Sequence, residues 1–482
     1  MVGPGPLVLV ALAVSRLTPC GNVSHAILTM KRDSLYLYII PIACVVLLLV
    51  FTLRLYTFAY FWNDDFNNLY WVQTQSFSQM VGYVVNPASD FFRPAGMFLY
   101  WAALQLFDRN AQAYHLLLWS LHAINVGLVY WILRRFTGSH AGAMVGAMLF
   151  SSQYLLNDLY WSFGTIFEVA SAMLYFAGIL LWSRERRSLK EIVLAIVLAS
   201  VVFLLAIKAK EMAITLPAIW LAYDLLIRRN MRWKMLVHLI LPVAIGAGYG
   251  FRKVLEMHGT YPTHPYYMDM RWLTLGRGFG GYFNWLFNVE LRWQIWAIGF
   301  TAILLMFLFL KKKPAAFFQL YIFITFLPVI FLINHREFFY WYIPLLGVSG
   351  LAAILTRDAA AFFGRFIPQR LLAPTSCALF ALLCYAAYGR TRDLTQSRRQ
   401  WQQGIAGDYR AFVRGLQSIP APPPGETLFF RSYPQYFDRG VLLFATQIAL
   451  RRTDIGAQLV DTFPPDARYR LRFEASRIIA EE

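Results

Sequence analysis

The sequence is divided by long apolar segments that carry almost no charge, each about as long as a membrane-crossing helix. A transmembrane helix needs roughly 17–25 mostly apolar residues, and hydropathy predicts about eleven such spans in this chain. They lie near residues 35–57, 112–133, 141–157, 161–182, 190–207, 211–227, 235–254, 293–310, 315–334, 338–355 and 370–388. The composition agrees, since only 15% of the residues are charged, against about a quarter in a typical soluble domain. The sequence therefore predicts an all-α polytopic membrane protein.

Basic residues account for a formal net charge of +18, and they gather in every second short loop. They are Lys31-Arg32, Arg134-Arg135, "RERRSLK" from Arg184, "RRNMRWK" from Arg228, "KKK" from Lys311, and Arg357, Arg365 and Arg370. This alternation is the positive-inside pattern, which predicts that these loops are cytoplasmic. We expect a bacterial inner (plasma) membrane protein with a cytoplasmic N-terminus and an outer, periplasmic C-terminus. The charge therefore reports orientation among membrane lipids and does not indicate a nucleic-acid partner.

Three longer regions interrupt the apolar rhythm, and the alternation places all of them on the outer face. They cover residues 58–110, 255–292 and 389–482. The predicted domains are an N-terminal extension and cytoplasmic start over 1–34, a transmembrane domain with large outer loops over 35–388, and a soluble outer tail over 389–482. Because "MKRDSLYLYII" from Met30 is typical of a membrane-protein start, we interpret residues 1–29 as an upstream extension. Because all three longer regions are predicted on the outer face of the membrane, we expect the functional site to lie on that face.

The tail has the pattern of a small α/β appendage. A polar stretch, "RTRDLTQSRRQWQQGIAGDYRAFVRGLQ", predicts an amphipathic helix, which "PAPPPGE" ends because proline cannot continue a helix. "TLFFRS" and "AQLVD" have strand character, and "RGVLLFATQIAL" between them has helix character.

Two adjacent carboxylates, Asp64 and Asp65, open the first outer loop in "FWNDDFNNLY". They suit a solvated membrane exit or the N-terminus of a helix, and they also suit general-base chemistry. Adjacent helical residues do not face the same way, so at most one of the two is expected to point at a given reaction centre.

Other charged residues lie where the apolar pattern predicts membrane depth or its edge. Lys208, Lys210 and Glu211 interrupt "AIKAKEMAITLP", and Glu168 lies a turn or two inside a predicted span. Ionised groups at membrane depth are costly and commonly mark a site, although a tight turn that reaches water is the alternative. Pro217 predicts a kink in the span that follows. His122 and Asn125 are interpreted as interhelical polar contacts.

A third polar cluster, "NHRE" at residues 334–337, lies among aromatic residues between two predicted spans. An ordinary short loop beside an aromatic belt explains it equally well. Together these clusters provide acids that can act as bases and cations that can bind an anion, mostly on one membrane face.

The order "NDDF", "FRP", "YHLLLWSLHAINVGLVYWIL" and "AKEMAITLP" resembles the GT-C superfamily of integral-membrane glycosyltransferases. The likeness covers roughly residues 35–345. It is nearest to the TMTC-type and protein O-mannosyltransferase-like branches, including bacterial members of glycosyltransferase family 39, although the chain has no tetratricopeptide repeats.

The resemblance implies transfer of a sugar, such as a hexose and in some relatives mannose, from a polyprenyl-phosphate donor with inversion. The acceptor hydroxyl would belong to a saccharide, a lipid or a protein. The resemblance implies that Asp64 is the base and Asp65 its support, or a ligand for a divalent metal such as Mg or Mn, although no cofactor is certain. Candidates for binding the donor phosphate are Arg93, Lys210 and Arg336, followed by Lys208 and His335. Glu211, Glu168 and His115 are candidate supporting residues.

Two other functions remain open on the sequence. A transporter or flippase for lipid-linked saccharides favours repeated halves with broken helices near the membrane midplane, and no convincing internal repeat is present. A non-catalytic assembly subunit would tolerate loss of both acids.

Overall fold

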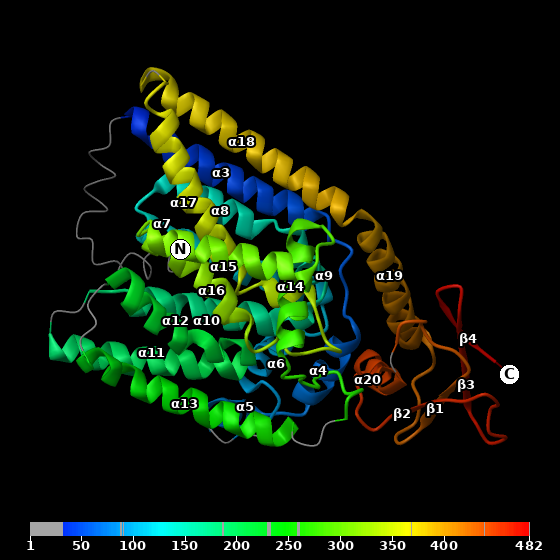
Figure 1. Cartoon of the computed structure of the whole chain (residues 1–482). Helices are drawn as coiled ribbons and strands as arrows, with labels where there is room; N and C mark the ends of the chain where they lie inside the picture. The colour runs from blue at the N-terminus through cyan, green and yellow to red at the C-terminus, as the bar shows by residue number, and fades with distance from the viewer. Residues whose placement is uncertain are drawn as a thin grey trace, which may run out of the picture.

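The computed structural model describes residues 32–86, 89, 91–185, 188–228, 233–257, 261–367, 369–437 and 439–481. The proposed extension over residues 1–29 lies outside these residues. Figure 1 shows a bundle of helices that ends, at its C-terminal side, in a small sheet.

Each predicted span corresponds to a helix in the bundle, so the predicted fold class is confirmed. The helices are α3 (Arg32–Arg54), α7 (Ala111–Thr137), α8 (His140–Ser151), α10 (Ile166–Trp182), α11 (Leu189–Ala209), α12 (Leu216–Tyr223), α13 (Trp233–Met257), α15 (Trp293–Phe309), α16 (Lys313–Phe326), α17 (Leu345–Phe363) and α18 (Gln369–Leu394). Among the described residues, four helices are long and apolar enough to cross a membrane, namely α7, α11, α17 and the helical stretch Phe163–Trp182. The protein is an integral membrane protein.

Two spans are shorter and more broken than the sequence predicts. Between α8 and α10 the chain forms η1 (Tyr154–Leu156), α9 (Asn157–Trp161) and η2 (Phe163–Thr165). The span predicted at 211–227 is divided into η3 (Glu211–Thr215), α12 and the π-helical turn η4 (Asp224–Arg228). Pro217 lies in the first turn of α12, directly after the 3-10 helix η3, where its missing N–H has no intrahelical partner. The kink at this residue stays a prediction.

Close helix packing in the bundle depends on small residues. A Cβ atom on Gly142 of α8 would lie 2.3 Å from the carbonyl oxygen of Ala353 in α17. One on Gly146, a turn later, would lie 2.7 Å from that of Ser349. Small residues at this four-residue spacing let helix backbones approach one another in membranes.

Polar residues also join the helices, as predicted for His122 and Asn125. The Nδ1 atom of His122 lies 2.8 Å from the hydroxyl of Tyr342. The Asn125 amide donates to that hydroxyl at 3.0 Å and to the carbonyl of Val169 at 2.9 Å. All three side chains are buried, so these contacts link α7 to α10 and to the segment just before α17.

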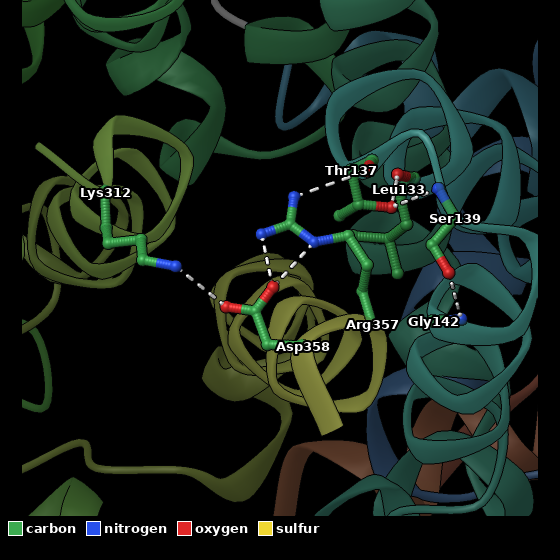
Figure 2. A network of polar contacts seen from close by, with 7 residues as sticks. All are labelled: Leu133, Thr137, Ser139, Gly142, Lys312, Arg357 and Asp358. Carbon is green, nitrogen blue, oxygen red and sulfur yellow. Dashed lines mark hydrogen bonds and ion pairs between the residues drawn. The ribbon is translucent and has the colours of Figure 1, made fainter. Parts of the chain in front are cut away.

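One end of the bundle holds the basic loops that the alternation predicts on a common side. Figure 2 shows Arg357 and Asp358 of α17 between Lys312, at the start of α16, and Thr137, at the end of α7. Arg357 pairs with Asp358 at 2.7 Å and donates to the carbonyl of Thr137 at 3.4 Å, and Lys312 reaches Asp358 at 3.2 Å. The turn between α7 and α8 is closed here by Ser139, whose hydroxyl accepts from the Gly142 N–H.

The predicted outer loops contain helices that the sequence analysis does not assign. They are α4 (Asn63–Gln73), α5 (Phe77–Val85), α6 (Pro94–Phe107) and α14 (Trp272–Phe287). Within the described residues, an isolated antiparallel bridge joins Met268, in the second of these loops, to Leu332, just before the loop at residues 334–337.

The tail is α/β, as predicted, but more elaborate. It contains α19 (Gln396–Ser418), β1 (Thr427–Phe430), α20 (Arg439–Leu450), β2 (Gly456–Leu459), β3 (Tyr469–Glu474) and β4 (Arg477–Ala480). The sheet order is β2-β1-β3-β4, with β1 parallel to both of its neighbours and β3 antiparallel to β4. Strands β3 and β4 are not predicted from the sequence. Helix α18 packs along α3 and continues past residue 388, so the tail begins within a helix (Figure 1).

Candidate active site

A cavity of about 910 Å³ lies where α4, the start of α10, the end of α11 and the tail meet; we call it the Asp64 cavity. Its charged or titratable lining residues are Asp64, Arg93, Asp158, Glu168, Lys210, His335, Glu337 and Arg398. Its aromatic lining residues are Trp62, Trp71, Phe91, Phe92, Trp161, Phe167, Tyr266, Phe339 and Trp401. Several sequence clusters that lie far apart in the chain therefore meet in one place.

The two aspartates have different environments, as their adjacency in a helix requires. Both lie in the first turn of α4, where the helix dipole favours negative charge. Asp64 is exposed and lines the cavity, whereas Asp65 is buried. Only Asp64 is therefore placed to meet a substrate.

Asp65 fixes the start of α4. One carboxylate oxygen accepts from the backbone N–H of Trp62 at 2.7 Å, closing a reciprocal cap, and the other accepts from the Tyr100 hydroxyl at 2.6 Å. Burial raises the pKa of Asp65 to about 7, although these hydrogen bonds oppose that rise. The helix-cap interpretation thus applies to Asp65, which holds the helix that carries Asp64.

Arg93 enters the cavity from the residue that precedes α6. Its guanidinium makes a forked ion pair with Glu211, with Nη2 at 3.0 Å and Nε at 3.2 Å from the carboxylate. The rings of Phe92 and Phe167 lie 4.4 and 5.4 Å from the guanidinium carbon. Arg93 has φ 42° and ψ 59°, a left-handed conformation that costs free energy in a residue with a Cβ atom.

Lys210 and Glu168 form a second, deeper ion pair. The Lys210 Nζ atom lies 2.5 Å from Glu168 Oε1, and both side chains are almost wholly buried. Because α11 ends at Ala209, Lys210 is extended, with φ −157° and ψ 136°. Its ammonium lies 5.4 Å from the ring centre of Phe339 and 5.6 Å from that of Tyr340. Lys210 and Glu211 therefore pair with different partners.

The loop at residues 334–337 contributes His335 and Glu337 to the cavity. Burial, together with the positive charges of Lys210 and Arg93, lowers the pKa of His335 to about 4. The imidazole is thus neutral at pH 7 and offers a hydrogen bond rather than a charge. Burial raises the pKa of Glu337 to about 7.

Besides Asp65 and Glu211, three other candidate residues lie outside the cavity lining. Lys208 donates to the carbonyls of Tyr83, Val84 and Asn86 at 3.3, 2.7 and 2.5 Å, so it holds the end of α5. Arg336 donates to the carbonyl of Leu332 at 3.3 Å. His115 is buried in α7, with Nε2 at 3.3 Å from the carbonyl of Tyr60.

The tail supplies cavity residues that sequence reasoning does not find. Arg398 of α19 binds both oxygens of Asp158 at 2.9 and 3.0 Å, although the two residues are 240 positions apart. Trp401, one turn later, lies within 6.2 Å of the ring centres of Trp62 and Trp161. Asp158 is detectable as a charge among apolar residues, but Arg398 lies in a charged helix and has no such signal.

The described residues contain no group of three or more His, Cys, Asp or Glu side chains that could hold a metal ion. Both oxygens of Asp65 already accept hydrogen bonds from the protein. A metal ligated by Asp65 therefore stays a prediction without support from this geometry.

No family model and no curated protein matches this chain. Its structure is similar to the crystal structure of ArnT from Cupriavidus metallidurans bound to undecaprenyl phosphate, with a TM-score of 0.50 and 13% sequence identity. Its similarity to ArnT of the same organism in the apo state has a TM-score of 0.51. Both matches cover 87% of this chain and 85% of that one. The chain has a GT-C fold. The predicted GT-C fold is thus confirmed, whereas the nearer likeness to protein O-mannosyltransferases stays a prediction.

Proposed function

We propose that this GT-C protein is an inverting glycosyltransferase, which moves a sugar, such as a hexose, from a polyprenyl-phosphate donor to an acceptor hydroxyl at the outer membrane face. The observation that carries the proposal is the Asp64 cavity, where an exposed carboxylate shares a space of about 910 Å³ with Arg93 and Lys210. The similar ArnT structure contains undecaprenyl phosphate, which supports a donor of that class.

The cavity has the groups that this reaction needs. The acceptor oxygen attacks the anomeric carbon from the side opposite the phosphate, and Asp64 removes its proton. The bond from that carbon to the phosphate oxygen breaks, and the electron pair leaves with the polyprenyl phosphate. A positioned base typically contributes about 10²–10⁴-fold in rate, and fixed cations stabilise the charge that develops on the leaving group. No general acid is required, because the phosphate leaves without protonation.

The donor phosphate would join existing ion pairs in the cavity. Arg93 binds Glu211 through Nε and Nη2, and Lys210 reaches Glu168 at 2.5 Å. These carboxylates hold the two cations in place before the donor binds, which supports electrostatic stabilisation without reorganisation. The backbone strain at Arg93 is consistent with this role, since such strain clusters at binding sites.

The aromatic side of the cavity suits the acceptor. Trp62, Trp161 and Trp401 line it beside Asp64, and indole rings present flat apolar faces with a polar N–H edge. A saccharide acceptor, which has apolar ring faces and hydroxyl edges, complements this surface. A lipid or protein hydroxyl remains an alternative acceptor.

The experiment is donor turnover by the purified full-length protein in detergent, with a panel of undecaprenyl- and dolichyl-phosphate sugars. We expect release of the polyprenyl phosphate, and Asp64→Asn should reduce turnover by about 10²-fold or more while donor binding survives. Asn67→Ala, one turn along α4 in the same cavity, controls for disturbance of the lining and should cost much less. Donor binding without turnover across the panel, or an unaffected Asp64→Asn variant, would contradict the proposal; the former outcome favours a transporter or flippase.

A further inference from the structure

A second cavity, of about 430 Å³, lies on the other side of α4 from the Asp64 cavity; we call it the arginine cavity. Arg109, Arg410 and Arg414 line it, together with Tyr60, Gln112 and Gln417. It forms where the start of α7 meets the segment before α4 and the tail helix α19.

The positive charge of this cavity is poorly compensated. No carboxylate is among its lining residues. Arg109 pairs at 3.0 Å with Asp108, whose other oxygen pairs with Arg451. Arg414 forms no ion pair with the residues that the structure describes, and Arg410 donates to the Phe58 carbonyl at 3.0 Å. Asp108 thus pairs with Arg109 and Arg451, and within the described part of the chain Arg410 and Arg414 have no carboxylate partner.

The Asp64 cavity shows the opposite pattern. There Arg93, Lys210 and Arg398 each pair with a carboxylate of Glu211, Glu168 and Asp158, respectively. A folded protein gains little from placing several cations together without counter-charges, because like charges repel most strongly where water is partly excluded. The excess in the arginine cavity therefore calls for an anion from outside the chain.

Two further features favour an anion here. Ala111 and Gln112, at the N-terminus of the 27-residue helix α7, line the cavity. The side chain of Asn110 caps this helix by accepting from the Ala113 N–H at 3.4 Å. The first turn of α7 has no acidic residue, so no negative charge in that turn offsets the positive end of the helix dipole. The Nε atom of Arg109 is buried without a hydrogen-bond partner, a state that costs free energy unless a ligand accepts from it.

We propose that the arginine cavity is a binding site for a phosphate-class anion, either free or as the headgroup of a membrane lipid. Guanidinium groups suit this chemistry because they bind phosphate oxygens in pairs. Tyr60, Phe61 and Phe66 also line the cavity and flank Asp64 in sequence, so the bound anion lies against the segment that carries Asp64. The site is independent of the proposed transferase reaction.

The test measures binding by the full-length protein rather than activity. In one arm, inorganic phosphate is titrated in detergent by calorimetry; in the other, native mass spectrometry counts bound phosphatidylglycerol against phosphatidylcholine. We expect one of these arms to show specific binding, and the double variant Arg410→Gln, Arg414→Gln should weaken it at least tenfold, since a charge-assisted contact contributes about 1.5–3 kcal/mol. Arg468→Gln removes an exposed tail charge that lines neither the Asp64 cavity nor the arginine cavity. This control variant should bind as the wild type does.

Each outcome decides the matter. If the double variant loses binding of inorganic phosphate, the ligand is a free anion. If it loses only the binding of phosphatidylglycerol, the ligand is a lipid headgroup. Arg414→Glu gives an independent check, because this exposed side chain can be reversed in charge with little risk to folding, and it should weaken binding further than Arg414→Gln. The proposal is overturned if neither probe distinguishes the double variant from the wild type, or if Arg468→Gln loses as much affinity.

Discussion

The buried ion pair between Lys210 and Glu168 allows two roles of the Lys210 ammonium to be distinguished. It either binds the donor phosphate or serves only as the counter-charge of Glu168. Lys210 is 5% exposed and Glu168 4%, and their charged atoms lie 2.5 Å apart. Replacing Lys210 by Met keeps the apolar stem but leaves the Glu168 carboxylate buried without its partner. Replacing Glu168 by Gln in the same protein removes that unpaired charge.

The two variants should differ in stability. Breaking a buried ion pair from one side costs about 3–5 kcal/mol, whereas replacing both members is often nearly neutral. Lys210→Met should therefore lower the free energy of unfolding by an amount of that order, and the double variant Lys210→Met, Glu168→Gln should recover most of the loss. Donor affinity should instead stay reduced in both variants, because both lack the Lys210 ammonium. Losing a contact of about 1.5–3 kcal/mol weakens affinity by about tenfold to a hundredfold.

The assay combines thermal unfolding in detergent with direct binding of a polyprenyl-phosphate sugar to the folded fraction. Lys208→Met serves as the control, because Lys208 supports α5 through three carbonyls and does not line the Asp64 cavity. It should lose stability but keep donor affinity. The reasoning is refuted if the double variant regains wild-type donor affinity along with its stability, since Lys210 would then act only as the counter-charge of Glu168.

Three further outcomes are expected. Burial raises the pKa of Asp65 to about 7 in the folded protein, so the folded state holds the proton more tightly and stability should fall as the pH rises from about 4 to about 7. Asp65→Asn cannot ionise and should show a shallower fall in a thermal unfolding series; parallel curves would contradict this. Trp401→Ala should raise the acceptor KM several-fold and leave kcat within about twofold, because it removes one aromatic face on which the acceptor stacks. Steady-state kinetics with varied acceptor concentration measures both constants. A fall in kcat without a rise in KM would count against a role in acceptor binding. A reporter fused at Arg390 should be active on the outer side only, and activity confined to the cytoplasm would reverse the predicted topology.

The sequence by itself determined the membrane class and the order of the helices, because apolar length is a local property that the bilayer thickness converts into spans. It also predicted that Asp64 and Asp65 could not share one role, since adjacent helical side chains diverge. The bundle has a helix at each predicted span. It turns Asp64 to a cavity, whereas Asp65 is buried and accepts from the Tyr100 hydroxyl.

Only the tertiary structure decided which charged groups meet. Lys208 and Lys210 are two residues apart, yet the end of α11 at Ala209 turns one to the carbonyls at the end of α5 and the other to Glu168. Arg398 reaches Asp158 across 240 residues. Such partners are chosen by the way distant helices pack, and a charge in the sequence shows that a counter-charge is needed without showing which one supplies it.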